Sequence, residues 1–216
     1  NKKMAFGVDT LSRRIYTIKV KDLSTGEMYP DKIDGVNSYT TWAADSKTMF
    51  YTGKDEQTLR SDRIFRHSLG ENQDDDTLVY EEKDETFSTF VYPSKSREYI
   101  MIGSSSTMST EYRFLSSKTP LDPFKIIQKR ERGLEYSPSH VGDMFYISTN
   151  MNESTNFKLV KTPISSTEKS NWKDVIPHRE DVLIEAPDFF NDFMVIGERS
   201  NGLLKIRIKS WDGKED

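Results

Sequence analysis

The sequence contains no cysteine. This absence excludes a disulfide scaffold and any thiolate chemistry. It favours a reducing compartment, so we expect a cytoplasmic protein, with the periplasm as the alternative. Long apolar runs are also missing, since none approaches the roughly 18 residues that a membrane-spanning helix needs. We therefore expect no membrane partner.

An excess of positive charge is missing as well. Lysine and arginine number 31 against 35 aspartates and glutamates, which gives a net charge of −4. Without a basic stripe to follow a phosphate backbone, nucleic acid is not expected as a partner. Helical periodicity is absent from any window of about a dozen residues. What remains is a series of short segments rich in Val, Ile, Tyr, Phe and Thr, which predicts an all-β protein.

One hairpin pattern recurs along the chain. An aromatic or apolar residue is followed by a polar turn and then by an alternating apolar run. The four copies are WAADSKTMFYT (Trp42–Thr52), FVYPSKSREYIMIG (Phe90–Gly103), YSPSHVGDMFYIS (Tyr136–Ser148) and APDFFNDFMVIG (Ala186–Gly197). They start 48, 46 and 50 residues apart. A period in the forties that holds four strands is typical of β-propeller blades.

The pattern predicts a β-propeller of four-stranded antiparallel blades, with about five blades covered and three complete. The first blade lacks its first strand, and its last strand is expected near Met28, apart from the next blade's first strand at Ser38–Trp42. The last blade lacks its fourth strand. The predicted blades are 1–36, 37–84, 85–132, 133–180 and 181–216. A seven-bladed ring needs roughly 340 residues, so we expect an arc of such a ring, and either its open flanks pair edge to edge between copies or the arc is distorted.

Several stretches resemble a known family. The longest is DSKTMFYTGKDEQTLRSDRIFRHSLGENQDDDTLVYEEKDETF (Asp45–Phe87), supported by Tyr16–Asp31, Glu135–Asn150 and Val175–Glu185. In collinear order over nearly the whole chain, they resemble the propeller of the prolyl oligopeptidase family, and within it the oligopeptidase B (protease II) branch. One series of motifs is more specific than a generic blade. It consists of TLR, a strand ending in RH, then LG, and an acidic loop before LVYEEKD.

The resemblance implies one part of a two-part serine peptidase. A seven-bladed propeller would act as lid and size filter over a C-terminal α/β-hydrolase domain of the same parent chain, which carries a Ser, Asp and His triad. The implied substrates are short peptides, cut after Lys or Arg by means of acidic residues in the hydrolase half. The resemblance implies no cofactor.

Catalytic residues are not predicted in this chain. A hydrolase of that class needs a G-x-S-x-G nucleophile elbow between a strand and a helix. The nearest match, Gly103–Thr107 around Ser105, lacks the second glycine and is better interpreted as a polar loop at a strand end. The histidines His67, His140 and His178 fall in different predicted blades, where structural or solvated roles are expected rather than that of a base.

Metal and binding residues are not predicted either. The acidic residues between 71 and 82 lack the alternate spacing and glycine of a calcium loop, which favours a solvated loop; they are Glu71, Asp74, Asp75, Asp76, Glu81 and Glu82. The basic residues Lys129, Arg130 and Arg132 are interrupted by Glu131, as expected for a strand. Two glutamates near first strands, Glu135 and Glu185, are the candidates for ion pairs with the hydrolase domain.

A different class of function remains as the alternative. A stand-alone propeller that binds a protein or a glycan would share the same blade pattern, because propellers host many functions. The resemblance outside the generic blade pattern and the incomplete first and last blades argue against it. The sequence that follows Asp216 would separate the two interpretations.

Overall fold

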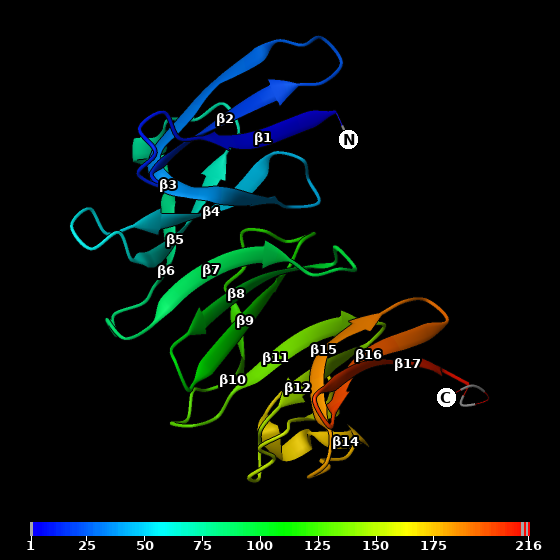
Figure 1. The fold of residues 1–216 in the computed structure, drawn as a ribbon. Coiled ribbons are helices and arrows are strands. Elements are labelled where there is room, and N and C mark those ends of the chain that lie inside the picture. Colours follow the sequence, from blue (N-terminus) through cyan, green and yellow to red (C-terminus); the bar gives the residue numbers. More distant parts are fainter. Residues whose placement is uncertain (1, 213, 215) are drawn as a thin grey trace. The chain divides into compact units, whose positions relative to one another are not determined.

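Strands make up nearly all of the regular structure (Figure 1). The computed structural model describes residues 2–212, 214 and 216. In this part of the chain the helical segments are two three-residue 3-10 turns, η1 (Gln73–Asp75) and η2 (Lys169–Asn171). No helix among the described residues is long and apolar enough to span a bilayer. The prediction of an all-β fold is confirmed.

The strands form four antiparallel sheets, and in each sheet successive strands are hydrogen-bonded neighbours. The first sheet contains β1 (Lys3–Val8), β2 (Tyr16–Asp22), β3 (Met28–Trp42), β4 (Thr48–Lys54), β5 (Ser61–Ser68) and β6 (Thr77–Glu81). The second contains β7 (Ser88–Pro93), β8 (Tyr99–Ser105), β9 (Thr110–Ser116) and β10 (Lys125–Gln128). The third contains β11 (Tyr136–Val141), β12 (Met144–Thr149), β13 (Lys158–Pro163) and β14 (Lys173–Ile176). The fourth contains β15 (Leu183–Phe189), β16 (Phe193–Ser200) and β17 (Leu203–Ser210).

The chain divides into two compact units. One comprises Asn1–Thr107 with Tyr112–Ile126, and the other comprises Met108–Glu111 with Ile127–Asp216. The first unit therefore holds the six-stranded sheet and most of the second sheet. The second unit holds the third and fourth sheets. Each unit has a hydrophobic core of its own.

The hairpin between β3 and β4 forms as the sequence predicts, with Trp42 opposite Met49. Its turn is stabilised by Asp45, whose carboxylate accepts hydrogen bonds from the backbone N–H groups of Lys47 and Thr48, each at 2.9 Å. The Thr48 hydroxyl donates to the same carboxylate at 2.7 Å. A short acidic side chain that satisfies backbone donors two and three residues ahead is the local reason for a turn at this place.

The start of the first sheet differs from the prediction. The expected strand near Met28 and the expected separate strand at Ser38–Trp42 are one 15-residue strand, β3. Its first half pairs with β2 and its second half with β4, with a shift in register between Val36 and Thr40. Gly35 has a φ of +74°, a conformation open to glycine. The backbone therefore bends within one continuous strand where the sequence predicted two separate strands.

This shared strand joins two predicted blades, 1–36 and 37–84, into one six-stranded sheet. The second and third sheets have four strands each, and the fourth has three. The blade boundaries themselves stay a prediction, because β3 passes through the position of the first one without a break in strand structure.

Strand β4 carries the core of the first unit, because it is buried on both faces. Alternate residues of a strand point to opposite faces. Met49 and Tyr51 accordingly pack with Ile18 and other residues of β2 and β3. Phe50 points the other way and packs with Ile100 and other residues of the second sheet.

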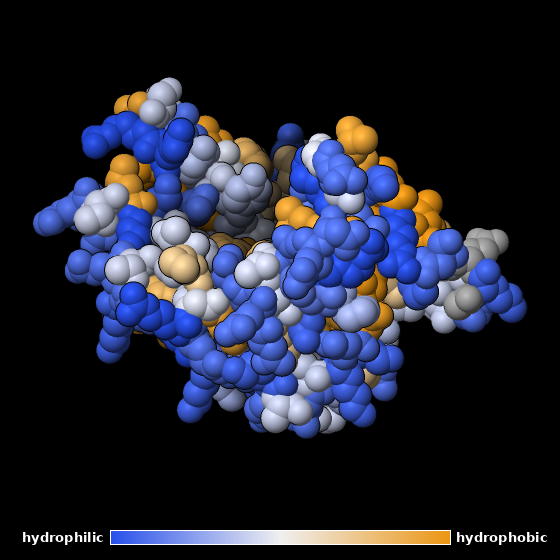
Figure 2. Space-filling model, turned by 60° about the horizontal axis from the view of Figure 1, so that its bottom comes forward, coloured by the Kyte–Doolittle hydropathy of each residue, from blue (hydrophilic) through white to orange (hydrophobic). Residues whose placement is uncertain are grey.

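The core of the second unit lies between the third and fourth sheets. Leu159 and Ile176 of the third sheet pack against Met194 and Ile196 of the fourth. Among the described residues, the last strand, β17, is hydrogen-bonded to one strand, β16. Its apolar side chains remain exposed, and Figure 2 shows hydrophobic residues at the surface on the side of the C-terminus. They are Leu203, Leu204, Ile206 and Ile208, each more than half exposed. Pairing of copies through such an edge stays a prediction.

Candidate functional site

The residues considered as catalytic candidates belong to different structural elements. Ser105 is the last residue of β8, so it stands at a strand end as expected. His67 lies in β5, in the first unit. His140 lies in β11 and His178 follows β14, both in the second unit. No group of three or more His, Asp or Glu side chains in the described part of the chain is arranged to hold a metal ion.

His67 is instead the centre of a buried polar cluster in the first unit. Its Nδ1 lies 2.7 Å from Oδ1 of Asp76, and its Nε2 lies 2.9 Å from Oδ1 of Asp31. The Tyr51 hydroxyl donates to the second oxygen of Asp76 at 2.7 Å. The His67 ring is completely buried. Both ring nitrogens face carboxylates, so the arrangement favours the doubly protonated imidazolium.

The electrostatics of this cluster follow from two opposing effects. Burial by itself lowers the pKa of His67, but the hydrogen bonds and negative charges of Asp76 and Asp31 outweigh it, and the pKa is raised above its ordinary value. Burial, followed by the bond to Asp76, also raises the pKa of Tyr51. One oxygen of Asp31, Oδ2, is buried without a hydrogen-bond partner among the described residues. Removing any single member of a buried ion network of this kind is strongly destabilising, because it leaves a buried charge without its partner.

The acidic residues between 71 and 82 therefore do not behave as one solvated loop. Glu71, Asp74 and Asp75 are exposed, as the solvated-loop interpretation predicts. That interpretation is wrong for two members. The side chain of Asp76 is 3% exposed and binds His67, and Glu82 is 3% exposed. The cost of burying Glu82 is offset by the hydrogen bond that it accepts from the Tyr80 hydroxyl at 2.6 Å.

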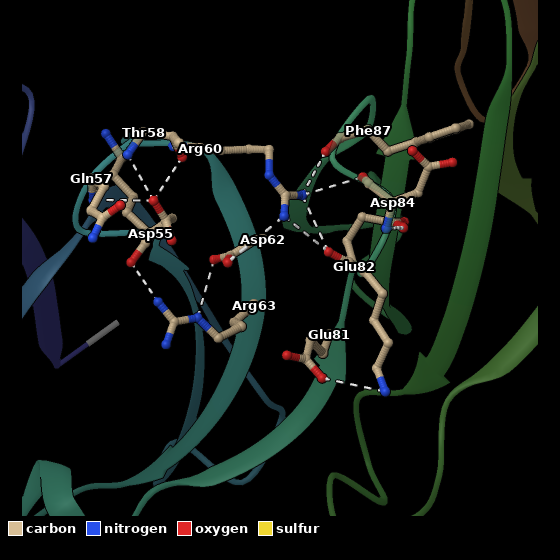
Figure 3. Close-up of polar contacts among 12 residues, drawn as sticks. Asp55, Gln57, Thr58, Arg60, Asp62, Arg63, Glu81, Glu82, Asp84 and Phe87 are labelled. Carbon is tan, nitrogen blue, oxygen red and sulfur yellow. Dashed lines mark hydrogen bonds and ion pairs between the residues drawn. The ribbon is translucent and has the colours of Figure 1, made fainter.

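A second polar cluster ties the loop after β4 to the segment that connects β6 with β7 (Figure 3). The Arg60 guanidinium donates to the backbone carbonyl of Phe87 at 2.8 Å, to that of Glu82 at 3.2 Å and to that of Asp84 at 3.4 Å. The Arg60 side chain is only 19% exposed and lies 4.0 Å from the Asp62 carboxylate. One side chain thus binds three carbonyls of residues outside the strands, of which that of Asp84 also accepts a hydrogen bond from the Phe87 backbone N–H at 3.0 Å.

The loop that presents Arg60 is itself held by hydrogen bonds to Asp55. Asp55 accepts hydrogen bonds from the backbone N–H of Thr58 at 2.7 Å and from that of Gln57 at 3.1 Å. The Thr58 backbone bond is the main cause that lowers the pKa of Asp55. The loop therefore holds its shape at neutral pH, where Asp55 is charged.

A similar contact between a loop side chain and a connecting segment occurs in the second unit. Asn156, at the end of the loop between β12 and β13, donates to the carbonyls of Arg179 and Glu180 at 3.0 and 2.7 Å. Those carbonyls belong to the segment that leads from β14 to β15. Upstream, the Ser109 hydroxyl before β9 accepts from the Gly133 N–H at 3.0 Å. In three successive repeats, a side chain from the loop between the second and third strands thus fixes the segment that leads to the next sheet.

We expect the change Arg60→Met to lower the free energy of unfolding by about 1–3 kcal/mol, because it leaves partly buried carbonyls without donors. Hydrogen exchange should speed up at the amides of residues 82–87. Urea denaturation and exchange monitored by NMR measure the two effects. The exposed Arg97→Met is the matched control and should change stability by less than about 0.5 kcal/mol. Equal losses in both variants would contradict a specific role for Arg60.

The two glutamates expected to face a partner domain have contacts within their own unit. The backbone N–H of Glu135 donates to the Asn150 side chain at 2.9 Å, and the Asn150 amide returns a contact to the Glu135 carboxylate at 3.5 Å. Glu185 forms an ion pair with Arg199 at 2.7 Å. Asn150 also lines an open cavity of about 300 Å³. Their proposed role between domains stays a prediction.

Repeated antiparallel meanders of this kind, joined by side-chain-anchored connectors, define the chain as a β-propeller portion. The particular family follows from the sequence comparison. Residues 1–215 match the family described as "Prolyl oligopeptidase, N-terminal beta-propeller domain", and the chain belongs to that family. The predicted fold class and the predicted resemblance are both confirmed.

Individual relatives agree with this assignment. Dipeptidyl aminopeptidase BI of Pseudoxanthomonas mexicana is 40% identical over 100% of this chain and 30% of its own length. Protease 2 of Moraxella lacunata is 34% identical over 91% of this chain and 29% of its own length. The solved structure of oligopeptidase B from Leishmania major is 31% identical, with a TM-score of 0.91, over 97% of this chain and 29% of that one. The chain therefore spans less than a third of the relatives it matches.

Proposed function

We propose that this chain is part of the lid and size filter of an oligopeptidase B-like serine peptidase that hydrolyses short peptides after Lys or Arg. The observation that carries the proposal is the match to oligopeptidase B from Leishmania major, collinear over 97% of this chain with a TM-score of 0.91. In this proposal the catalytic machinery lies in an α/β-hydrolase domain of the same longer protein, and the chain alone is inactive.

The physical basis of the filter is steric. In the complete propeller of this proposal, blades whose connectors are held by side chains such as Arg60 and Asn156 would leave no opening that a folded protein can pass. A flexible peptide reaches the cleft when the lid opens. Closure then excludes water and completes the site, and opening can limit turnover.

One observation favours a second candidate activity, the removal of dipeptides from the N-terminus of a peptide. The relative that is 40% identical over the whole chain is called a dipeptidyl aminopeptidase, a name that describes removal of dipeptides from free N-termini. The alternative proposal is therefore a peptidase of the same architecture that requires an unblocked N-terminus. The two activities differ in whether an acyl-blocked peptide is a substrate.

The test uses the protein encoded by the complete open reading frame. Its substrates are a blocked peptide with Arg before a chromogenic leaving group, the same peptide with norleucine, and an unblocked dipeptide with the same leaving group. We expect kcat/KM for the blocked Arg peptide to exceed that for the norleucine peptide by at least about 100-fold, or roughly 2.7 kcal/mol of transition-state discrimination. The 216-residue chain alone should give no turnover.

Each other result has a definite meaning. Cleavage of the unblocked dipeptide substrate alone would replace the leading proposal with the dipeptidyl activity. Absence of hydrolysis of all three substrates would overturn both. Cleavage of a folded protein as fast as of a 10-residue peptide would contradict the size filter.

A further inference from the structure

The first unit contains a cavity of about 350 Å³ lined by residues of β5, β6 and β9 and of the loop that follows β9. Two of its lining residues are arginines, Arg66 from β5 and Arg113 from β9. Aromatic and aliphatic side chains, among them Tyr80, Phe124 and Leu121, form the rest of its wall together with one carboxylate, that of Asp122. The cavity thus combines an apolar wall with a net positive charge, in a chain whose net charge is −4.

Arg66 keeps its charge available to a ligand. Its guanidinium donates to the Pro120 carbonyl at 3.3 Å and to the Thr77 hydroxyl at 3.4 Å. Both acceptors are neutral and both bonds are long. Within the described residues, no carboxylate lies within ion-pair distance of Arg66. An arginine does not lose its proton in proteins, so this positive charge is permanent.

Arg113 and the aromatic wall are held in place before any ligand binds. The Arg113 guanidinium lies over the Tyr80 ring, 4.2 Å from its centroid. The Tyr80 hydroxyl donates to Glu82 at 2.6 Å and contacts the Ser104 hydroxyl at 3.0 Å. Phe124 meets the buried ring of Phe50 edge-on at 5.6 Å. A preorganised wall reduces the ordering that binding would otherwise require.

We propose that this cavity binds a carboxylate attached to an apolar or aromatic group. The planar guanidinium matches a carboxylate in a bidentate manner, and the wall formed by Tyr80, Phe124 and Leu121 accepts the apolar part. Asp122 also lines the cavity. Its negative charge repels the carboxylate of the ligand, so we expect the affinity for the ligand to be moderate. A peptide C-terminus and a free aromatic acid both offer this chemistry. The site does not depend on the proposed peptidase activity, because all of its residues belong to the first unit of this chain.

The test is titration of the chain with four probes, followed by calorimetry and by NMR shifts of the amides around the cavity. The probes are phenylacetate, phenylacetamide, the tripeptide Ala-Ala-Phe and its C-terminal amide. We expect the carboxylates to bind at least about 10-fold more tightly than the amides, since a hydrogen bond to a charged group is worth that factor or more. If both phenylacetate and Ala-Ala-Phe bind, the ligand of the cavity is any carboxylate attached to an aromatic group. If Ala-Ala-Phe alone binds, the ligand is a peptide C-terminus.

Three variants make the proposal falsifiable. Arg66→Gln should weaken carboxylate binding at least about 10-fold while the circular dichroism spectrum stays unchanged. Asp122→Asn, at an exposed residue, should tighten binding a few-fold. Lys118→Gln removes one positive charge from an exposed side chain of the same loop that does not line the cavity, and should change little. Equal binding of acids and amides, an unchanged affinity in Arg66→Gln, or no binding of any probe would overturn the proposal.

Discussion

The change His67→Leu is expected to lower the free energy of unfolding by about 3–5 kcal/mol, the range for removing one partner of a buried ion network. Leucine fills a similar volume but leaves Asp31 and Asp76 buried without the imidazolium that they share at 2.9 and 2.7 Å. Urea denaturation of the chain at pH 6 measures the loss. The control His178→Leu alters a half-buried histidine with one long contact of 3.4 Å from Asn156. It should cost under about 1 kcal/mol.

The pH dependence gives the same prediction a second check. The pKa of His67 is raised in the folded chain, so folding favours the charged form of this residue. Its contribution to stability is complete below the pKa of the unfolded chain, about 6.5. It is lost as the pH rises through the raised pKa of the folded state. The stability difference between the native sequence and His67→Leu should therefore shrink as the pH rises from neutral to alkaline. A difference that grows with pH would contradict the charged imidazolium.

The change Phe50→Ala is expected to cost about 3–5 kcal/mol, because it opens a cavity between two packed sheets. Phe50 is completely buried and lies edge-on to Phe124, with ring centroids 5.6 Å apart. Thermal and urea unfolding measure the loss. Tyr39→Ala, in β3 but 76% exposed, is the control and should stay within about 0.5 kcal/mol. A cost below 1 kcal/mol for Phe50→Ala would mean that the two sheets collapse onto the vacated space.

Much of this fold could be predicted from local sequence patterns. The hairpin at Trp42–Thr52 could be predicted because Asp45 and its neighbours determine the turn through contacts two and three residues away. The period of the repeat then predicted stacked four-stranded sheets. The merging of two strands into β3 could not be predicted. Asp34 and Gly35 have the composition of a turn, and only pairing with β2 and β4 on either side keeps the strand continuous.

The polar clusters could not be predicted from local sequence patterns, because their contacts join residues far apart in the sequence. His67 meets Asp31 across 36 positions and Asp76 across nine, and nothing in the acidic run distinguishes Asp76 from its exposed neighbours. The anchoring role of Arg60 is equally non-local, since its acceptors are backbone carbonyls that carry no residue signature. One signal was available: Arg60, Ser109 and Asn156 lie near the ends of the loops between the second and third strands of successive repeats. Comparing the repeats by loop position, not by strand pattern, would have found it.

The uninterrupted course of β3 limits how such a protein can be rearranged by recombination. Arrays of repeats gain or lose members most easily where a flexible loop separates one member from the next. Between residues 28 and 42 the first half of β3 pairs with β2, the second half pairs with β4, and Val36 pairs with both, so a junction placed there falls within a paired strand and not in a flexible loop. The first two repeats should therefore be inherited, deleted or grafted as a pair.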